Sequence, residues 1–338
     1  MNPQQRLFWF RRLALAGALL AAAVVVLGAW VRLTDAGLGC PDWPGCYGHV
    51  YPQAGLSQSS LGFAKALHEM IHRYFATSLG IAITILLVWA VRWRQDAGQP
   101  LLPAALLFVI VCLQGALGAL TVTLLLTPLI VTAHLLGGLT TLGLLWWLSL
   151  APERRPVAER AVILRPYAWV ALAVLMVQIA LGGWTSTNYA ALACPDAPTC
   201  QHAWWPPMDF RNAFVLWRGV KLDYEGGVLA NPARIAIHVT HRLGALVAGP
   251  ILISLGVMAA TRNRNPRLAR AGRLLVLAVV LQITIGAAMV HWGVPLELAT
   301  LHNAGAVFLL ISMVTLLRAL WPASAIDMVP LPHAHPSP

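Results

Sequence analysis

Glu69 and His72 place a carboxylate and an imidazole three residues apart, where a polar segment of the chain enters a long apolar run. Residues three apart lie on one face of an α-helix, so the two side chains could serve one site. A carboxylate there could act as a general base or stabilise a cationic intermediate on a substrate. It could also be an ordinary acidic residue near a helix N-terminus, where it interacts favourably with the helix dipole.

Three further histidines, His134, His241 and His302, stand in places similar to that of His72, and each of the four is expected within the first two turns of its helix. A single histidine of this kind is more often a hydrogen-bonded packing residue. Four of them at one depth favour ligands, because ionisable groups in membrane helices are costly and mark functional sites by default. Two imidazoles facing each other across a bundle can bind one iron axially. We therefore predict two haem sites, one formed by His72 with His134 and one by His241 with His302. A zinc site is less favoured because no third ligand recurs.

The elements that must position these side chains are apolar segments long enough to cross a lipid bilayer. Of the 338 residues, 59% are hydrophobic and only 10% are charged, against about a quarter charged in soluble domains. A hydrocarbon core of about 30 Å needs roughly 20 apolar residues in a helix. We therefore predict an all-α polytopic membrane protein. Its eight expected transmembrane helices lie at 12–32, 71–92, 101–123, 128–150, 166–187, 236–260, 273–293 and 298–320.

Basic residues are unevenly divided between the expected loops. The net charge of +11 could by itself suggest a nucleic-acid partner. With the N-terminus inside, however, 15 of the 23 Lys and Arg residues fall in inner segments, although the outer loops are longer. The positive-inside rule therefore predicts both termini in the cytoplasm, the cysteine-containing loops outside, and no need for nucleic acid. The first apolar run is long and no small-residue cleavage site follows it, so we expect no cleaved signal peptide.

The second half of the sequence repeats the first. Cys194 and Cys200 follow Cys40 and Cys46 at a separation of 154 residues, within CPDAPTC and CPDWPGC. The His-Arg pair at 72–73 recurs 169 residues later, and His134 recurs 168 residues later. The change of separation indicates an insertion of about 15 residues in the second outer loop. We predict two pseudo-repeated four-helix bundles of the same orientation, at residues 1–150 and 166–321, with a cytoplasmic linker at 151–165 and a cytoplasmic tail at 322–338.

Glu69 has no acidic counterpart in the second half, where His238 stands three residues before His241. Both halves share the predicted haem ligands, but only the first pairs them with a carboxylate, so we place the chemistry there. Arg73 and Arg242 each follow a ligand candidate and could pair with haem propionates. They could equally be arginines that snorkel to the membrane surface. Three histidines near the outer face have no assigned role: His68, His238 and His291.

Four of the five cysteines fall in the two large outer loops, where disulfides persist. Each pair spans a short proline-containing turn that could close as a disulfide worth about 2 kcal/mol. An exposed pair could instead relay electrons or exchange thiols. The two interpretations are equally supported for the first pair, and the structural one is favoured for the second. The cysteines concerned are Cys40, Cys46, Cys194 and Cys200.

A few small or polar residues interrupt the apolar segments. Cys112 is expected to be a small core residue. Gln114, Gln178 and Gln282 each precede a glycine by four residues. This spacing is typical of an interhelical packing element and leaves a role toward a ligand open.

These residues together resemble a known family. Residues 31–44, VRLTDAGLGCPDWP, closely resemble the first outer loop of haem A synthases. The motif Glu69-x-x-His72-Arg73, together with His134, His241-Arg242 and His302, matches that family's motif set. The resemblance covers all eight segments and leaves the tail from about residue 322 unmatched.

The resemblance implies an oxidoreductase of the bacterial inner membrane that oxidises the C8 methyl group of haem O to the formyl group of haem A, with water as oxygen source. It implies that His72 and His134 hold the substrate haem, and that Glu69 stabilises a carbocation at the methyl carbon or activates water. His241 and His302 would ligate a resident haem b. The Cys40–Cys46 pair matches the family's first-loop pair, whose role as disulfide or electron relay is open.

The resemblance also indicates partners. A haem O synthase, which is a farnesyltransferase, would act upstream, and terminal oxidase assembly factors would act downstream. The lipid bilayer surrounds the chain, the electron acceptor is unidentified and a homo-oligomer is left open.

Residue chemistry alone supports a di-haem b-type electron-transfer cytochrome nearly as well. Such a cytochrome would need no Glu69 and should be symmetric between halves. A haem transporter is a third class; it needs a translocation path and often an energising partner, and the sequence has no ATP-binding loop. The haem extracted from the protein distinguishes the first two: haem O or haem A beside haem b indicates the enzyme, and haem b alone at two per chain indicates the cytochrome.

Overall fold

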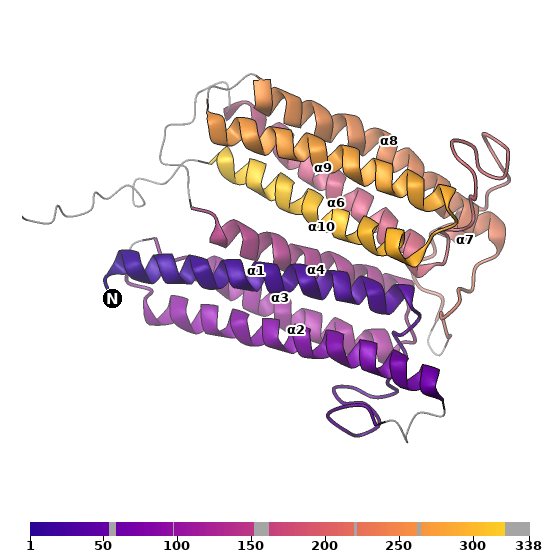
Figure 1. The fold of residues 1–338 in the computed structure, drawn as a ribbon, viewed down its shortest axis with the longest axis horizontal. Coiled ribbons are helices and arrows are strands. Elements are labelled where there is room, and N and C mark those ends of the chain that lie inside the picture. The colour runs from indigo at the N-terminus through magenta and orange to yellow at the C-terminus, as the bar shows by residue number, and fades with distance from the viewer. Residues whose placement is uncertain (54–58, 97, 152–161, 220–221, 262–264, 322–338) are drawn as a thin grey trace, which may run out of the picture.

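Helices form almost all of the regular structure in the residues that the structure describes. The computed structural model describes residues 1–53, 59–96, 98–151, 162–219, 222–261 and 265–321 (Figure 1). Eight of its helices are long and apolar enough to cross a membrane, which confirms the predicted all-α fold with eight spans. Most of the predicted linker and the whole predicted tail lie outside the described residues. The helices are α1 (Pro3–Leu33), α2 (Ser60–Arg92), α3 (Leu101–Thr123), α4 (Pro128–Ser149), α6 (Leu164–Thr187), the short α7 (Phe210–Ala213), α8 (Asn231–Thr261), α9 (Pro266–His291) and α10 (Leu296–Ala319).

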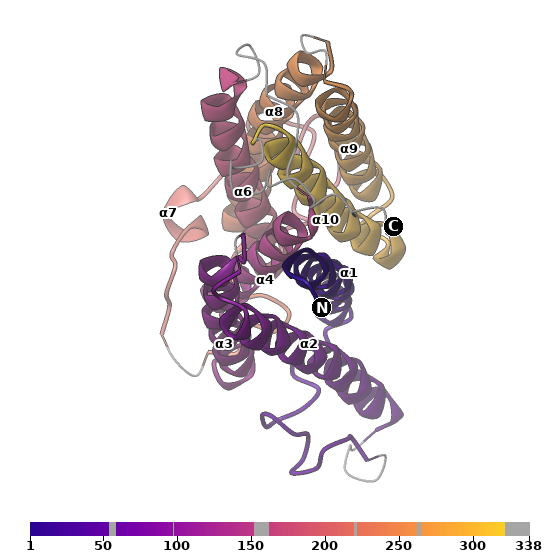
Figure 2. The ribbon, with the colours of Figure 1, turned by 90° about the vertical axis from the view of Figure 1, so that its left-hand side faces the viewer.

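The long helices pack as two groups of four (Figures 1 and 2). In the first group α1 packs on α2, α2 on α3, α3 on α4, and α4 back on α1. In the second group α6 packs on α8, α8 on α9, α9 on α10, and α10 back on α6. The groups meet where α4 contacts α6 and where α10 contacts α1 and α4. Each group is therefore a closed ring of helices whose side chains can meet in its middle.

Two helices that carry candidate histidines begin earlier than the apolar pattern predicts. The α2 helix begins at residue 60 rather than 71, because the Ser59 hydroxyl caps it by accepting the N–H of Gly62 at 3.1 Å. The α8 helix begins at residue 231 rather than 236. Apolar composition marks where a chain enters the bilayer, whereas capping decides where the helix begins. His72 and His241 therefore lie about three turns into their helices, and the prediction that they fall in the first two turns is wrong.

Small side chains line the packed face of α1. Ala14, Ala18 and Ala21 are each at most 1% exposed, which lets neighbouring helices approach closely. On α3, by contrast, Cys112 is exposed, so the prediction that it is a core residue is wrong. Apolar residues occupy both the lipid-facing and the packed sides of a membrane helix, and the sequence pattern therefore does not tell the two sides apart.

The loops that carry the cysteine pairs lie together at one end of the molecule, which we call the cysteine-loop end (Figure 1). They connect α1 to α2 and α6 to α8. The second loop reaches across to the first group of helices: the Tyr224 N–H donates to the Leu125 carbonyl at 3.2 Å, and Glu225 pairs with Lys65 of α2 at 3.3 Å. The second loop thus ties the two groups together at this end.

Candidate functional site

Each of the four candidate histidines lies against a glycine of the preceding long helix. A methyl group added at Gly28 or Gly286 would come within 2.9 Å of Cε1 of His72 or His302, respectively. The equivalent contact is 3.1 Å between Gly182 and His241 and 3.6 Å between Gly118 and His134. At three of these positions a side chain would therefore push the imidazole away. The glycines leave room for an imidazole at the same place in each pair of helices.

The imidazoles lie in two pairs, one in each group of helices. His72 of α2 and His134 of α4 are close enough to interact electrostatically, and so are His241 of α8 and His302 of α10. The Nδ1 atoms of His72, His134 and His302 are buried without a hydrogen-bond partner. Buried polar atoms are almost always paired. These unpaired ring nitrogens are therefore suited to bind a ligand. Two imidazoles on opposite sides of one iron are the donor set that haem takes.

A search of the described residues finds no group of three or more His, Cys, Asp or Glu side chains that could hold a metal ion. A tetrahedral zinc site needs at least three such ligands. The described part of the chain thus offers pairs of imidazoles, which suit a metal that brings its own equatorial ligands, as haem does.

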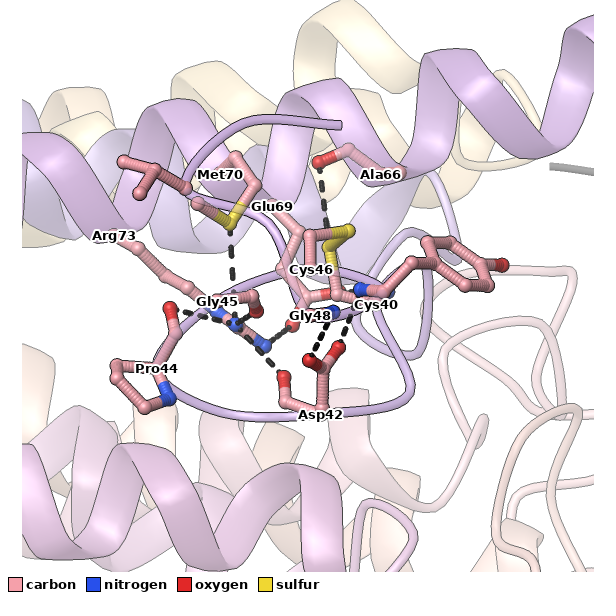
Figure 3. The surroundings of a disulfide bond; sticks show 12 residues. Cys40, Asp42, Pro44, Gly45, Cys46, Gly48, Ala66, Glu69, Met70 and Arg73 are labelled. Atoms are coloured by element: carbon pink, nitrogen blue, oxygen red, sulfur yellow. Dashed lines mark hydrogen bonds and ion pairs between the residues drawn. A yellow bond between two sulfur atoms is a disulfide. The ribbon is translucent and has the colours of Figure 1, made fainter. Parts of the chain in front are cut away.

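Glu69 is buried and doubly hydrogen-bonded at the cysteine-loop end of α2. Glu69 is only 4% exposed to solvent. The backbone N–H of Cys40 donates to Glu69 Oε2 at 2.9 Å, and Arg73 Nη2 donates to Oε1 at 2.5 Å (Figure 3). One positive charge and one backbone donor thus hold the carboxylate. Each oxygen keeps a lone pair for a further partner.

Arg73 links this carboxylate to the first cysteine loop. Its Nη1 donates to the backbone carbonyls of Asp42 at 2.9 Å and Pro44 at 3.2 Å, and also to that of Gly45 (Figure 3). The guanidinium was a candidate partner for haem propionates. In this structure its donors point to the loop and to Glu69.

An arginine holds the second cysteine loop in the same way, but no buried carboxylate stands at the position that corresponds to Glu69. Arg242 donates to the backbone carbonyls of Cys194 at 2.8 Å, Asp196 at 2.9 Å and Thr199 at 2.8 Å. His238 stands at the position that Glu69 has in the first half, and its Nδ1 lies 3.1 Å from the Ala190 carbonyl. The two loops share a scaffold, and the buried acid distinguishes the first.

Both cysteine pairs are joined as disulfides, Cys40 to Cys46 and Cys194 to Cys200. Cys40 and Cys46 are fully buried, where they pack against Ala66 and Met70 of α2. The first disulfide thus lies within one helical turn of Glu69 along α2. Its packing fits a structural role, and its place beside the buried acid also fits an electron relay.

Sequence reasoning overlooked Asp42 and Asp196, which organise the two loops. The Asp42 carboxylate accepts the N–H groups of Tyr47 at 2.6 Å and Gly48 at 2.7 Å. The Gly48 N–H, the largest influence, lowers the pKa of Asp42, and partial desolvation opposes it. Asp196 accepts from the Thr199 hydroxyl and from two backbone N–H groups, and its pKa is lowered mainly by Thr199. Their recurrence two residues after the first cysteine of each loop could have identified them.

Two further histidines near this end, His68 and His291, contact aromatic rings. His68 meets the Trp30 ring edge-on at 6.3 Å between centroids, beside a small apolar cavity between α1 and α2. His291 at the end of α9 meets Trp292 at 5.6 Å. Neither is buried beside the imidazole pairs, so neither belongs to the predicted ligand sets.

Eight apolar helices with two pairs of neighbouring imidazoles toward one end define a polytopic membrane protein. Residues 11–314 match the family described as cytochrome oxidase assembly protein, COX15-CtaA. The chain therefore belongs to this family.

Curated relatives carry a more specific name. A protein of Shewanella oneidensis named Heme A synthase is 39% identical over 333 residues, which cover 95% of this chain and 98% of the relative. Proteins of the same name from Rhodospirillum centenum and Rhodopseudomonas palustris are 29% and 26% identical, and their alignments cover 92% and 93% of this chain and 87% and 92% of the relatives. The similarity spans both groups of helices, so it is not confined to one half of the chain.

Proposed function

We propose that this protein is a haem A synthase, which oxidises the C8 methyl group of haem O to the formyl group of haem A for terminal oxidase biogenesis. One observation carries the proposal: only one of the two imidazole pairs has a buried carboxylate beside it, in a chain whose relatives are named Heme A synthase. A cytochrome that only transfers electrons does not need a carboxylate beside one of its two haems. The di-haem cytochrome is therefore disfavoured.

The two halves take different haems in this proposal. His72 and His134 would hold the substrate haem, and His241 and His302 would hold a resident haem b. The unpartnered ring nitrogens and the four facing glycines support both assignments. When bound, haem b supplies one-electron transfer. Because no acid accompanies His241, the second half serves as the electron-transfer side.

Glu69 is the catalytic residue at the substrate methyl group. Conversion of the methyl group and one water into a formyl group releases four electrons and four protons. The electrons pass one at a time to an external acceptor, and water provides the oxygen. Since each Glu69 oxygen has one donor from the chain, its remaining lone pairs can accept a proton from water or stabilise positive charge on the methyl carbon.

Arg73 and the Cys40 N–H position this carboxylate. The guanidinium pairs with Glu69 in a buried place and compensates its charge. The propionates of the substrate remain alternative partners for Arg73, as they do for Arg242 in the second half. The first disulfide holds the Cys40 N–H in place and could also relay electrons.

We also propose how the protein is oriented in the membrane. The described basic residues Arg6, Arg12, Arg92 and Arg94 lie at the end of the helices opposite the cysteine loops, and this end faces the cytoplasm by the positive-inside rule. The two helix groups are the repeated halves, residues 1–150 and 166–321. A haem O synthase in the same membrane supplies the substrate, and terminal oxidase assembly factors receive the product.

Co-expression with a haem O synthase tests the function. Haem A should appear in extracted haem when the wild-type chain is present, and it should fall to background in Glu69→Ala while bound haem b is kept. Haem b alone at two per chain, with no haem A under any condition, would make the protein a cytochrome. Loss of haem b from His241→Ala and His302→Ala tests the placement of the resident haem.

A further inference from the structure

Two glutamines hold the histidines of the second half. The Nε2 atom of Gln178, on α6, donates to the backbone carbonyl of His241 at 3.0 Å and lies 3.1 Å from its Nδ1. The Nε2 atom of Gln282, on α9, donates to the carbonyl of His302 at 3.1 Å and lies 3.3 Å from its ring. Each amide thus contacts the backbone and the ring of the same histidine. This contact fixes the rotation of the imidazole.

A glycine three residues after the histidine makes room for the amide. A methyl group at Gly244 or Gly305 would overlap the Oε1 atom of Gln178 or Gln282. Gly137, three residues after His134, stands in the same relation to Gln114 of α3. The combination of glutamine, histidine and glycine, which we call the amide clamp, therefore holds His241 and His302, while Gln114 lies against the matching glycine near His134.

The clamp offers what an iron ligand requires. An imidazole bound to a metal carries a proton on its other ring nitrogen and donates it to an acceptor, which fixes the ring. The Oε1 atoms of all three glutamines are buried without a hydrogen-bond partner. Turning the amide to bring this oxygen to the ring N–H gives up the bond from Nε2 to the histidine carbonyl. Each glutamine therefore offers the ring one partner, a donor as observed or an acceptor after the turn.

His72 has no clamp. Val24 occupies the place in α1 that Gln178 has in α6, 154 residues later, and His72 lies against the Val24 backbone. Phe75 takes the place of the clamp glycine. Gly28 faces His72 just as Gly182 faces His241, so the helices keep the same register. The side-chain amide is replaced by an apolar residue, whose backbone hydrogen-bonds to His72 instead.

We propose that Gln178 and Gln282 are positioning residues that hold His241 and His302 as permanent haem ligands, and that the unclamped His72 is the ligand that releases the iron when haem enters and leaves the first half. This inference rests on the proposed function, in which the first half must exchange substrate for product and the second keeps its haem.

Haem capture by apomyoglobin tests the inference. Purified protein is titrated with haem b to its limit and mixed with excess apomyoglobin, and the transferred haem is followed by absorbance. We expect a fast phase from the first half and a slow phase from the second. Gln178→Leu and Gln282→Leu should accelerate the slow phase by about 10- to 100-fold, the usual effect of removing a partner of a ligand histidine. Gln114→Leu should change only the fast phase.

Two further measurements separate positioning from general damage. Val24→Gln with Phe75→Gly should slow the fast phase by building the missing clamp. Gln282→Glu, which keeps an acceptor, should restore the slow phase and the low-spin electron paramagnetic resonance signal that Gln282→Leu shifts. The inference would be overturned if Gln178→Leu and Gln282→Leu left the rate of the slow phase unchanged. It would also be overturned if the two haems of the wild type were transferred at equal rates. Failure to bind a second haem would instead overturn the proposed substrate site.

Discussion

The hydroxyl of Tyr189 donates a hydrogen bond to Asp35 Oδ1 at 2.7 Å, although the two residues are 154 positions apart. The same separation relates Cys40 to Cys194. A second contact, from Arg32 Nη2 to the Ser186 carbonyl at 2.6 Å, also joins residues 154 apart. These residues thus lie where the two helix groups meet at the cysteine-loop end.

This junction should contribute to stability. Arg32 pairs with Asp35 at 3.3 Å and stacks over the Tyr189 ring at 4.0 Å. Tyr189→Phe removes one hydrogen bond and keeps the stacking, so it should lower the free energy of unfolding by about 1 kcal/mol. Thermal unfolding in detergent, followed by circular dichroism, measures the difference. Tyr189→Ala should cost more because the stacking is also lost; equal effects of the two variants would show that the hydroxyl alone matters.

The glycines that face the histidines give a graded prediction for haem binding. Gly286→Ala and Gly28→Ala place a methyl group 2.9 Å from an imidazole, so the ring must move and axial ligation should fail. Gly118→Ala meets its imidazole at 3.6 Å, an ordinary contact, and serves as the matched control. Haem content by pyridine haemochrome should fall in the first two variants and persist in the third. Equal haem content in Gly286→Ala and wild type would show that the imidazole of His302 is not a ligand.

The position of Glu69 predicts a loss of reaction without a loss of binding. Glu69→Gln keeps an oxygen that can accept the Cys40 N–H but removes the charge beside Arg73. Formation of haem A should fall by about 10²-fold or more, the usual contribution of a positioned acid–base group. Bound haem b should stay at the wild-type amount.

His238→Gln is the control for this prediction, because His238 stands at the matching place in the second half and bonds a backbone carbonyl. It should leave haem A formation near the wild-type level. If both variants lose haem A formation equally, the burial of this helix position matters more than its acidity.

Much of the fold and part of the site could be predicted from the sequence. The length of the apolar segments predicts the eight helices, because the thickness of the bilayer sets the length of a helix that crosses it. The repeat in the sequence predicts which histidines pair. The partners of Glu69 could not be predicted. Its contacts with the Cys40 N–H and Arg73 depend on how a loop folds back on α2, and no local pattern encodes that path. The link between Gln178 and the His241 ring was equally hidden, because the spacing of a glutamine and a glycine fits plain helix packing.

The first cysteine loop should loosen at acid pH because Asp42 must be ionised to hold it. Its pKa is lowered in the folded protein, mainly by the Gly48 N–H. A lowered folded-state pKa gives stabilisation that is complete above the unfolded value of about 3.9 and is lost as the pH falls through the lower, folded value. The loop should therefore be unaffected between pH 7 and about 5 and should open below this window.

The rate at which a phosphine reduces the Cys40–Cys46 disulfide reports this opening. Asp42→Asn should be reduced faster than the wild type near neutral pH, by up to about fivefold, since an exposed charged contact is worth no more than about 1 kcal/mol. The ratio of the two rates should approach one as the pH falls below the folded pKa, because the wild-type carboxyl is then also neutral. Asp196→Asn should leave the first disulfide unchanged. A ratio that stays constant across the whole pH range would show that the Asp42 charge does not hold the loop.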